Sequence, residues 1–134
     1  MIKFNDIRIG DYLKAEYEGK MWDGEVVRLN GDEKQVCVKT DVQEFWFETD
    51  HLHPLELSEE ALLKLSFQKQ TNGDSSVKYL KGSFRIVTPV AGDFSQMEMW
   101  YREDRRHNPD VRYVHQLQNM YLDMTKIHLT NNPM

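Results

Sequence analysis

The sequence is poor in cysteine and has no long apolar run. Its single cysteine, Cys37, cannot form an internal disulfide, and no cysteine cluster is present to hold a structural zinc ion. No apolar stretch approaches the roughly 20 residues that a bilayer-spanning helix needs. The first residues also lack the basic and apolar regions of a signal peptide. We therefore expect a cytoplasmic protein that does not contact a membrane and is stabilised by packing alone.

Positive charge is outnumbered by negative charge. The 134 residues carry 17 Lys and Arg against 22 Asp and Glu, a formal net charge of -5, which argues against general affinity for a phosphate backbone. The excess of acid lies in residues 1–67, which have 8 basic and 15 acidic side chains, whereas residues 68–134 have 9 and 7. In the first half the charges alternate with apolar residues, as on the solvated face of a sheet. A surface for a basic partner is the alternative interpretation.

The first half contains four short segments in which apolar and polar residues alternate, the pattern of half-buried strands. Between the second and third of them, Asn30-Gly31-Asp32 is a strong hairpin signal. A flat sheet of four such strands would expose one apolar face and two edges, so coiling into a small barrel is the economical arrangement. We therefore predict an SH3-like β-barrel over residues 1–57. Its expected strands are residues 11–17, 22–29, 35–40 and 44–48.

Residues 58–134 predict a helix, an antiparallel three-strand meander and a C-terminal helix. Ser58 can cap a helix over residues 59–65, and Asn108 followed by Pro109 predicts the start of a helix over residues 110–124. With the barrel, this gives an α+β fold whose two parts we expect to pack as one compact body. Further alternating or extended segments predict the remaining strands: residues 77–80, 83–88 and 96–103 in the meander, a strand that begins at 67–69, and a piece at 127–129 that pairs with a sheet edge.

The C-terminal helix should bury one stripe of apolar side chains. Val114, Leu117, Tyr121 and Met124 fall at spacings of three and four residues, which places them on one face. The polar residues between them lie off this stripe, on the side that we expect to be exposed. They are His115, Gln118 and Asn119. Alternatively, their amides hydrogen-bond to a neighbouring strand or loop.

Three segments resemble a family of small bacterial proteins that are often found in phage-like or mobile regions and have no assigned function. They are Arg8-Ile9-Gly10-Asp11-Tyr12, the run from Pro54 to Phe67, and Tyr113-Val114-His115-Gln116-Leu117-Gln118-Asn119-Met120-Tyr121. The chain departs from the family pattern at Leu55-Glu56-Leu57-Ser58. It also departs at Ser66, a position that is usually glycine in the family. The resemblance implies the architecture given above and assigns no catalytic residue.

The first candidate binding site is aromatic. Trp46 points away from Phe45 and Phe47, and Glu44 and Glu48 flank it on its own face. Such a surface can bind a Lys- or Arg-bearing partner through cation-π contact, while its carboxylates repel nucleic acid. Tyr12 lies on the corresponding face of the first strand and completes this site. Alternatively, Trp46 packs against the second half of the chain.

Catalytic motifs are absent from the sequence. It has no Gly-rich phosphate loop, no nucleophile elbow and no His-Glu-x-x-His motif. His115 is the best remaining catalytic candidate, and with Gln118 and Asn119 it is also a candidate for ligand binding. We predict that the protein is not an enzyme and needs no cofactor.

An arginine group between the last strand and the last helix is the candidate nucleic-acid site. It comprises Arg102, Arg105, Arg106 and Arg112, with His107 among them. Acidic residues interleave with these arginines, namely Glu103, Asp104 and Asp110, so local ion pairs are the favoured interpretation.

A metal site is the weakest candidate. Asp50, His51 and His53 lie close in sequence and Cys37 could join them, but zinc normally takes three or four protein ligands with further support. We therefore predict no metal. The preferred function is a non-enzymatic module that binds a protein partner, the alternative is a nucleic-acid-binding accessory protein of a phage or mobile element, and an enzyme comes third.

Overall fold

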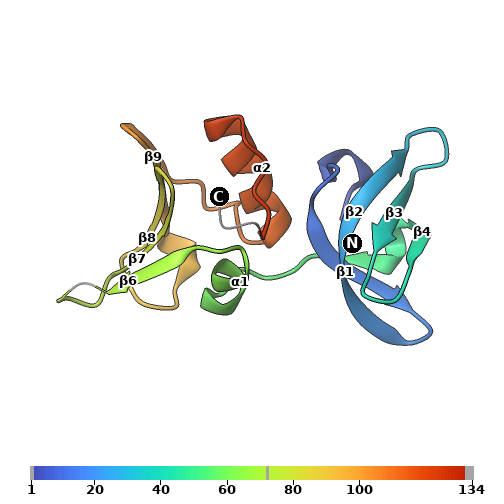
Figure 1. The fold of residues 1–134 in the computed structure, drawn as a ribbon, viewed down its shortest axis with the longest axis horizontal. Helices are drawn as coiled ribbons and strands as arrows, with labels where there is room; N and C mark the ends of the chain where they lie inside the picture. Colours follow the sequence, from blue (N-terminus) through green and yellow to red (C-terminus); the bar gives the residue numbers. More distant parts are fainter. Residues whose placement is uncertain (1, 72, 132–134) are drawn as a thin grey trace. The chain divides into compact units, whose positions relative to one another are not determined.

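The computed structural model describes residues 2–71 and 73–131. The protein is α+β, with two five-stranded antiparallel sheets and two α-helices in the described part (Figure 1). No helix among these residues is both long and apolar enough to cross a bilayer. The chain divides into two compact units. Unit 1 comprises Met1–Leu55 and Tyr113–His115, and unit 2 comprises Glu56–Arg112 and Gln116–Met134.

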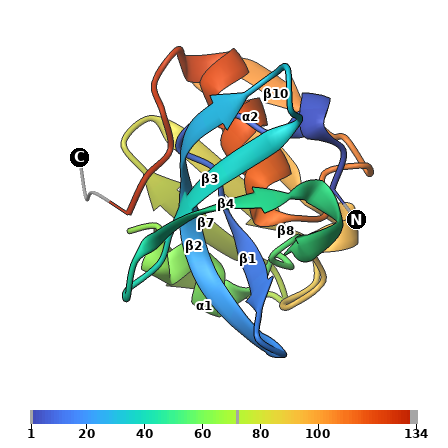
Figure 2. The same cartoon turned by 90° about the vertical axis from the view of Figure 1, so that its right-hand side faces the viewer.

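Unit 1 is one coiled sheet with the strand order β4-β3-β2-β1-β5 (Figure 2). The four strands predicted from alternation are present, and a fifth, very short strand follows them. The strands are β1 (Tyr12–Tyr17), β2 (Lys20–Asn30), β3 (Gln35–Lys39), β4 (Glu44–Glu48) and β5 (Leu52–His53), with 3-10 turns η1 (Phe4–Asp6) and η2 (Thr49–His51).

The turns of unit 1 follow from their residues. Glu18 and Gly19 both have positive φ, 52° and 74°, which is the type I′ geometry that matches the twist of a two-residue hairpin. The Asn30 side chain accepts hydrogen bonds from the backbone N–H groups of Asp32 and Glu33, at 3.1 and 3.2 Å. In β2, a Cβ atom on Gly24 would collide with Val38, so glycine lets two coiled strands approach closely.

The sheet of unit 1 is not a closed barrel, so the prediction of closure was wrong. Its inward face does build the expected single core. However, β5 has only two residues and pairs with β1 alone, which is too short to continue the ladder around to β4. The core consists of Ile2, Ile7, Leu13, Ala15, Val26, Val36, Val38, Phe47 and Leu52, with Phe4, Leu29 and Phe45 packed against it.

Unit 2 contains a second sheet with the strand order β10-β9-β8-β7-β6. The predicted three-strand meander is its centre, and the strand predicted to begin at residues 67–69 is present at one edge. The strand at the other edge was not predicted, because all of its residues are exposed and it lacks half-buried alternation. The strands are β6 (Gln68–Thr71), β7 (Val77–Lys81), β8 (Phe84–Thr88), β9 (Glu98–Tyr101) and β10 (Asp104–Arg106), with a 3-10 turn η3 (Phe94–Gln96).

Two helices pack on one face of this sheet (Figure 1). In α1 (Glu59–Lys64), the Ser58 side chain accepts a hydrogen bond from the backbone N–H of Ala61, at 3.1 Å, as its capping role predicts. From α2 (Val114–Thr125), the ring of Tyr121 lies 4.7 Å from that of Phe84. The predicted stripe is confirmed, because Val114, Leu117, Tyr121 and Met124 are all buried.

The predicted start of the last helix was wrong. Asn108 accepts a hydrogen bond from the backbone N–H of Asp110, at 3.0 Å, but this bond closes a local turn. Helix α2 begins four residues later than expected, at Val114, whose backbone N–H donates to the carbonyl of Leu55 at 2.8 Å. Residues 127–129 form no strand, which contradicts their predicted sheet pairing. Leu129 is instead buried as a single side chain.

Buried polar groups in unit 2 are paired with backbone oxygens. The Lys81 ammonium donates to the carbonyls of Leu65 and Thr130, at 2.8 and 2.7 Å, and burial lowers its pKa. Gln118 donates its amide N–H to the carbonyl of Leu129 at 3.0 Å. These bonds attach segments without regular structure to the sheet and to α2, because a buried donor without an acceptor is costly.

Replacing Leu117 with alanine should destabilise the protein by about 2 to 5 kcal/mol, because this side chain is fully buried and leaves a cavity. The same change at Leu63, which is 47% exposed, is the matched control and should cost less than about 1 kcal/mol. Urea unfolding of the two variants measures the difference. Equal losses of stability in the two variants would contradict the burial of Leu117 on α2.

Candidate functional site

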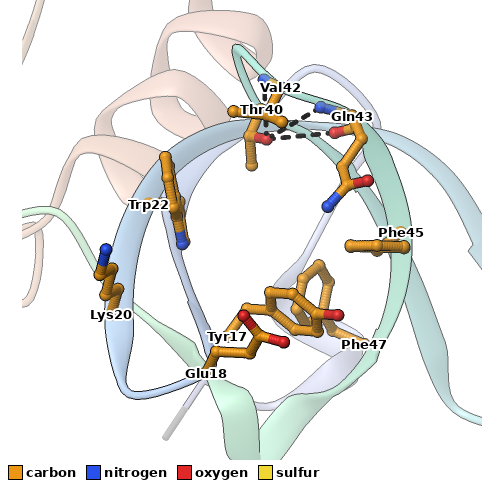
Figure 3. Close-up of a pocket in the computed structure, with 9 residues that line it drawn as sticks. All are labelled: Tyr17, Glu18, Lys20, Trp22, Thr40, Val42, Gln43, Phe45 and Phe47. Atoms are coloured by element: carbon orange, nitrogen blue, oxygen red, sulfur yellow. Dashed lines mark hydrogen bonds between the residues drawn. The ribbon is translucent and has the colours of Figure 1, made fainter.

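A pocket of about 180 Å³ opens at one end of the coiled sheet of unit 1 (Figure 3). Its side chains come from the β1–β2 hairpin, from the β3–β4 turn and from β4, and they surround an open space. Four of them are aromatic. The lining residues are Tyr17, Glu18, Lys20, Trp22, Thr40, Val42, Gln43, Phe45 and Phe47.

The aromatic rings form a connected wall. The ring of Tyr17 lies 4.9 Å from that of Phe45, and Phe45 meets Phe47 edge to face at 6.3 Å. Trp22 stands across the open space from Phe45 (Figure 3). Phe47 belongs to the core, whereas Tyr17 is 40% exposed, so the wall runs from the hydrophobic core to the surface.

The β3–β4 turn holds the remaining side of the pocket in place. The Thr40 hydroxyl donates to the carbonyl of Gln43 at 3.1 Å and accepts from the backbone N–H groups of Val42 and Gln43, at 3.3 and 3.4 Å. The backbone N–H of Thr40 also donates to the Gln43 carbonyl, at 2.9 Å. A turn fixed by four bonds presents Gln43 and Val42 to the pocket in a defined geometry.

The chemistry of the pocket suits an apolar group. Glu18 and Lys20 are the charged side chains of the lining, and their opposite signs leave it without net charge. The rest of the surface is mainly aromatic, with Thr40 and Gln43 as polar groups. Ligand sites for drug-sized molecules have volumes of roughly 300 to 1,000 Å³, so a space of about 180 Å³ suits a single amino-acid side chain.

The outward face of β4 carries the predicted aromatic site. Trp46 is 45% exposed. Glu44 and Glu48 flank it on the same face, since residues two apart share a face. Glu44 makes an ion pair with Arg28 at 3.2 Å. The face therefore combines an accessible indole ring with two carboxylates.

Tyr12 does not join this group. Tyr12 of β1 lies directly opposite Glu25 of β2. Glu25 lies opposite Lys39 of β3, and Lys39 lies opposite Glu44 of β4. Tyr12 thus shares the face of Trp46 but lies three strand spacings away, each about 4.8 Å. The structure separates two residues that alternation alone placed together.

Alternation placed Phe45 and Phe47 on the face opposite Trp46 but did not reveal the pocket that they line. No role was predicted for Tyr17 or Trp22. The sequence feature that could have indicated the pocket is the position of these aromatic residues. Inward-facing rings at the end of β1 and the start of β2 meet at the open end of a coiled sheet. Which strand ends meet there depends on the tertiary fold.

The helical candidates are not exposed, which corrects the prediction. His115 and Gln118 are both 4% exposed, and Asn119 is half-buried. The ring of His115 stacks on Tyr113, with centroids 6.1 Å apart, and its Nδ1 atom has no hydrogen-bond partner among the described residues. Burial lowers the pKa of His115, and the negative charge of Asp6 partly opposes this shift.

The arginine group is largely engaged with neighbours. Arg105 pairs with Glu98 and Arg106 pairs with Asp104, the latter at 3.0 Å. The other two make weaker contacts. Arg102 lies over the ring of Tyr101 at 5.1 Å, and the Arg112 side chain donates to the Pro109 carbonyl at 3.4 Å. The predicted pairing with an interleaved acid is thus present at Arg106, whereas Arg105 pairs with Glu98, which is not one of those acids.

A ladder centred on Trp100 was not predicted. Arg85 of β8 and Arg105 of β10 are its cross-strand neighbours, and their guanidinium carbons lie 5.2 and 5.6 Å from the indole ring. The sequence does not reveal this arrangement, because Arg85 and Trp100 lie in separate sequence segments. His107 also lies in this segment and bonds through Nδ1 to the carbonyl oxygen of Met97, at 2.8 Å.

The weak metal candidates are not brought together. His53 pairs with Glu16 at 3.1 Å, and His51 lies 3.8 Å from Asp50. Cys37 is buried in β3. Within residues 2–71 and 73–131, no three His, Cys, Asp or Glu side chains are arranged to hold a metal ion.

Comparison of the chain with known proteins finds no match among protein-family models, curated proteins or solved structures. The resemblance described from the sequence therefore stays a prediction.

Stability should decrease between about pH 7 and pH 5 in a way that depends on His115. The unfolded chain binds a proton there near the ordinary pKa of about 6.5, whereas the folded chain binds it only at lower pH, so acid favours unfolding. His115→Phe should reduce the loss of stability in urea titrations at the two pH values. His128→Phe changes an exposed histidine and should leave the loss unchanged. An unaltered loss in His115→Phe would contradict the burial of a neutral imidazole.

Proposed function

We propose that the protein is a non-enzymatic binding module, and that unit 1 binds a segment of a partner protein. One apolar side chain of the partner enters the aromatic pocket, while basic side chains contact the outward face of β4. The observation that carries this proposal is the aromatic lining of Tyr17, Trp22, Phe45 and Phe47, which reaches the surface around an open space of about 180 Å³.

Charge supports a basic partner. Unit 1 contains seven Lys and Arg against twelve Asp and Glu, a net charge of -5, so it holds the whole excess of acid in the chain. An exposed indole ring attracts a cation over its face, and Trp46 has carboxylates on both sides. Complementary charge speeds association and selects partners more than it adds affinity. The same acidity disfavours a phosphate-bearing partner.

The pocket supplies the apolar part of the binding energy. Full burial of a leucine-sized side chain is worth about 1.5 to 3 kcal/mol, which corresponds to about tenfold to a hundredfold in affinity. The fixed β3–β4 turn and the packed rings reduce the ordering cost of binding. The SH3-like arrangement of unit 1 is part of this proposal, supported by its five short antiparallel strands and single interior core.

Truncation of an aromatic side chain that lines the pocket should weaken binding of peptides selected on the intact protein. Random peptides displayed on phage are selected on the full chain, and their affinities are then measured by calorimetry. Trp22→Ala and Tyr17→Ala should each weaken these peptides at least about tenfold, because each removes aromatic surface from the bound side chain.

Trp100→Ala is the matched control, because it removes an indole from unit 2 and leaves the pocket intact. It should not change the affinities. Circular dichroism of each variant confirms that the fold is retained. Selected peptides that bind Trp22→Ala and Tyr17→Ala as tightly as the parent protein would refute the pocket as the binding site.

Binding to nucleic acid should be absent. The ladder of Arg85, Trp100 and Arg105 is the feature that favours this alternative, but Glu98 neutralises Arg105. Fluorescence anisotropy with single-stranded DNA and RNA should show no micromolar binding at about 0.15 M salt. Binding that weakens steeply with added salt, with a slope reduced by about one in an Arg85→Ala variant, would favour the alternative.

A further inference from the structure

Strand β4 has an unpaired edge in unit 1. In the sheet order β4-β3-β2-β1-β5 it is terminal, and among the described residues it pairs only with β3. A terminal strand presents a row of backbone N–H and C=O groups that another strand can pair with. The same strand carries Trp46 on its outward face and lines the pocket with Phe45 and Phe47.

The hydrogen-bond phase of the ladder identifies the free backbone groups. Thr40 donates to the carbonyl of the directly opposite residue, Gln43, at 2.9 Å, so this pair is hydrogen-bonded. Bonded and non-bonded pairs alternate along an antiparallel ladder. The backbone groups of Phe45 and Phe47 therefore face β3, and those of Glu44, Trp46 and Glu48 face the open edge.

We propose that the partner binds as an extended segment that adds a sixth strand to the edge of β4. This inference rests on the proposed function and specifies how the pocket is filled. An added strand would bond to the free backbone groups of Glu44 and Trp46 and to the N–H of Glu48, whose carbonyl accepts the first bond of the η2 turn. Its alternate side chains would then fall on the two faces that β4 already separates.

The chemistry of the two faces defines the sequence of the partner. Directly opposite residues in neighbouring strands share a face, with Cβ atoms about 4.5 to 5.5 Å apart. Residues opposite Glu44 and Glu48 should be basic, and an arginine opposite Trp46 can stack on the indole ring. Residues opposite Phe45 and Phe47 point to the inward face, where a leucine reaches the pocket. The matching segment alternates basic and apolar residues over five positions.

Charge complementarity favours this occupant over a second copy of the chain. The edge has two carboxylates on its outward face and belongs to a unit with a net charge of -5, so two copies of β4 would place like charges side by side. The ion pair between Arg28 and Glu44 on this face is solvent-exposed. Such a pair is weak, and a basic partner can replace it.

The test uses the full chain and the peptide acetyl-Gly-Lys-Leu-Arg-Leu-Lys-Gly-amide. Its alternation reads the same in both directions, so the basic and apolar residues match β4 in either strand orientation. Calorimetry should detect binding that weakens at least about tenfold in Trp22→Ala. A peptide with glutamate in place of every Lys and Arg has the same length and apolar residues, and it should not bind.

Two variants at Glu48 separate backbone pairing from charge. Glu48 has φ -78°, which proline can adopt, and its N–H faces the open edge. Glu48→Gln removes the carboxylate and keeps the N–H, whereas Glu48→Pro removes both. Strand addition predicts that Glu48→Pro weakens the peptide about threefold to tenfold more than Glu48→Gln, as expected for the loss of one hydrogen bond.

Methylation of the peptide backbone gives a second readout that cannot disturb the fold of the protein. Each peptide N–H is methylated in turn, and strand addition predicts loss of binding at every second position. Loss at the Lys and Arg positions indicates an antiparallel strand, and loss at the Leu positions indicates a parallel one. Either pattern supports the inference.

The failure of this inference differs from the failure of the proposed function. Binding that needs Trp22 but shows no alternation, with equal affinities for Glu48→Pro and Glu48→Gln, would overturn strand addition and leave the pocket as the binding site. So would failure of this peptide where display-selected peptides bind in a Trp22-dependent way. If no peptide binds through Trp22 or Tyr17, the proposed function and the inference both fail.

Discussion

The sheet of unit 1 is too small to enclose its own interior. Its last strand, β5, has two residues and pairs with only part of β1, so the ladder ends before it reaches β4. Gly24 allows β2 and β3 to approach closely, yet coiling alone cannot satisfy the backbone of a terminal strand. The open edge of β4 and the aromatic pocket are both consequences of this incomplete closure.

Alternation along β4 then assigns each group of this strand a separate role. The inward rings of Phe45 and Phe47 join the core and the pocket wall. The outward face presents an exposed indole between two carboxylates, and the backbone groups of the outward residues face the unpaired edge. A strand with these three surfaces can recognise apolar groups, cations and an extended backbone, which is why one short element supports the proposed binding mode.

Buried polar side chains have a different role in unit 2. The hydroxyl of Tyr79 donates to Glu59 at 3.0 Å, and burial together with this bond raises the pKa of Tyr79 to about 12. Lys81 and Gln118 similarly bond to backbone carbonyls. Because unpaired buried groups are costly, these bonds restrict how helix α1 and the loops that carry the other acceptors pack. They stabilise the fold and do not mark a site.

The sequence by itself determined the elements whose signals are local. Alternation predicted the four strands of residues 11–48, capping predicted α1, and spacing predicted the buried stripe of α2. Tertiary structure alone decided what depends on distant segments: whether the sheet closes, which aromatics meet in the pocket, and how far Tyr12 lies from Trp46. It also decided the start of α2, since the backbone N–H of Val114 bonds to Leu55, 59 residues earlier in the chain. Local patterns encode which face a side chain occupies, whereas its neighbours depend on how strands pair across the whole chain.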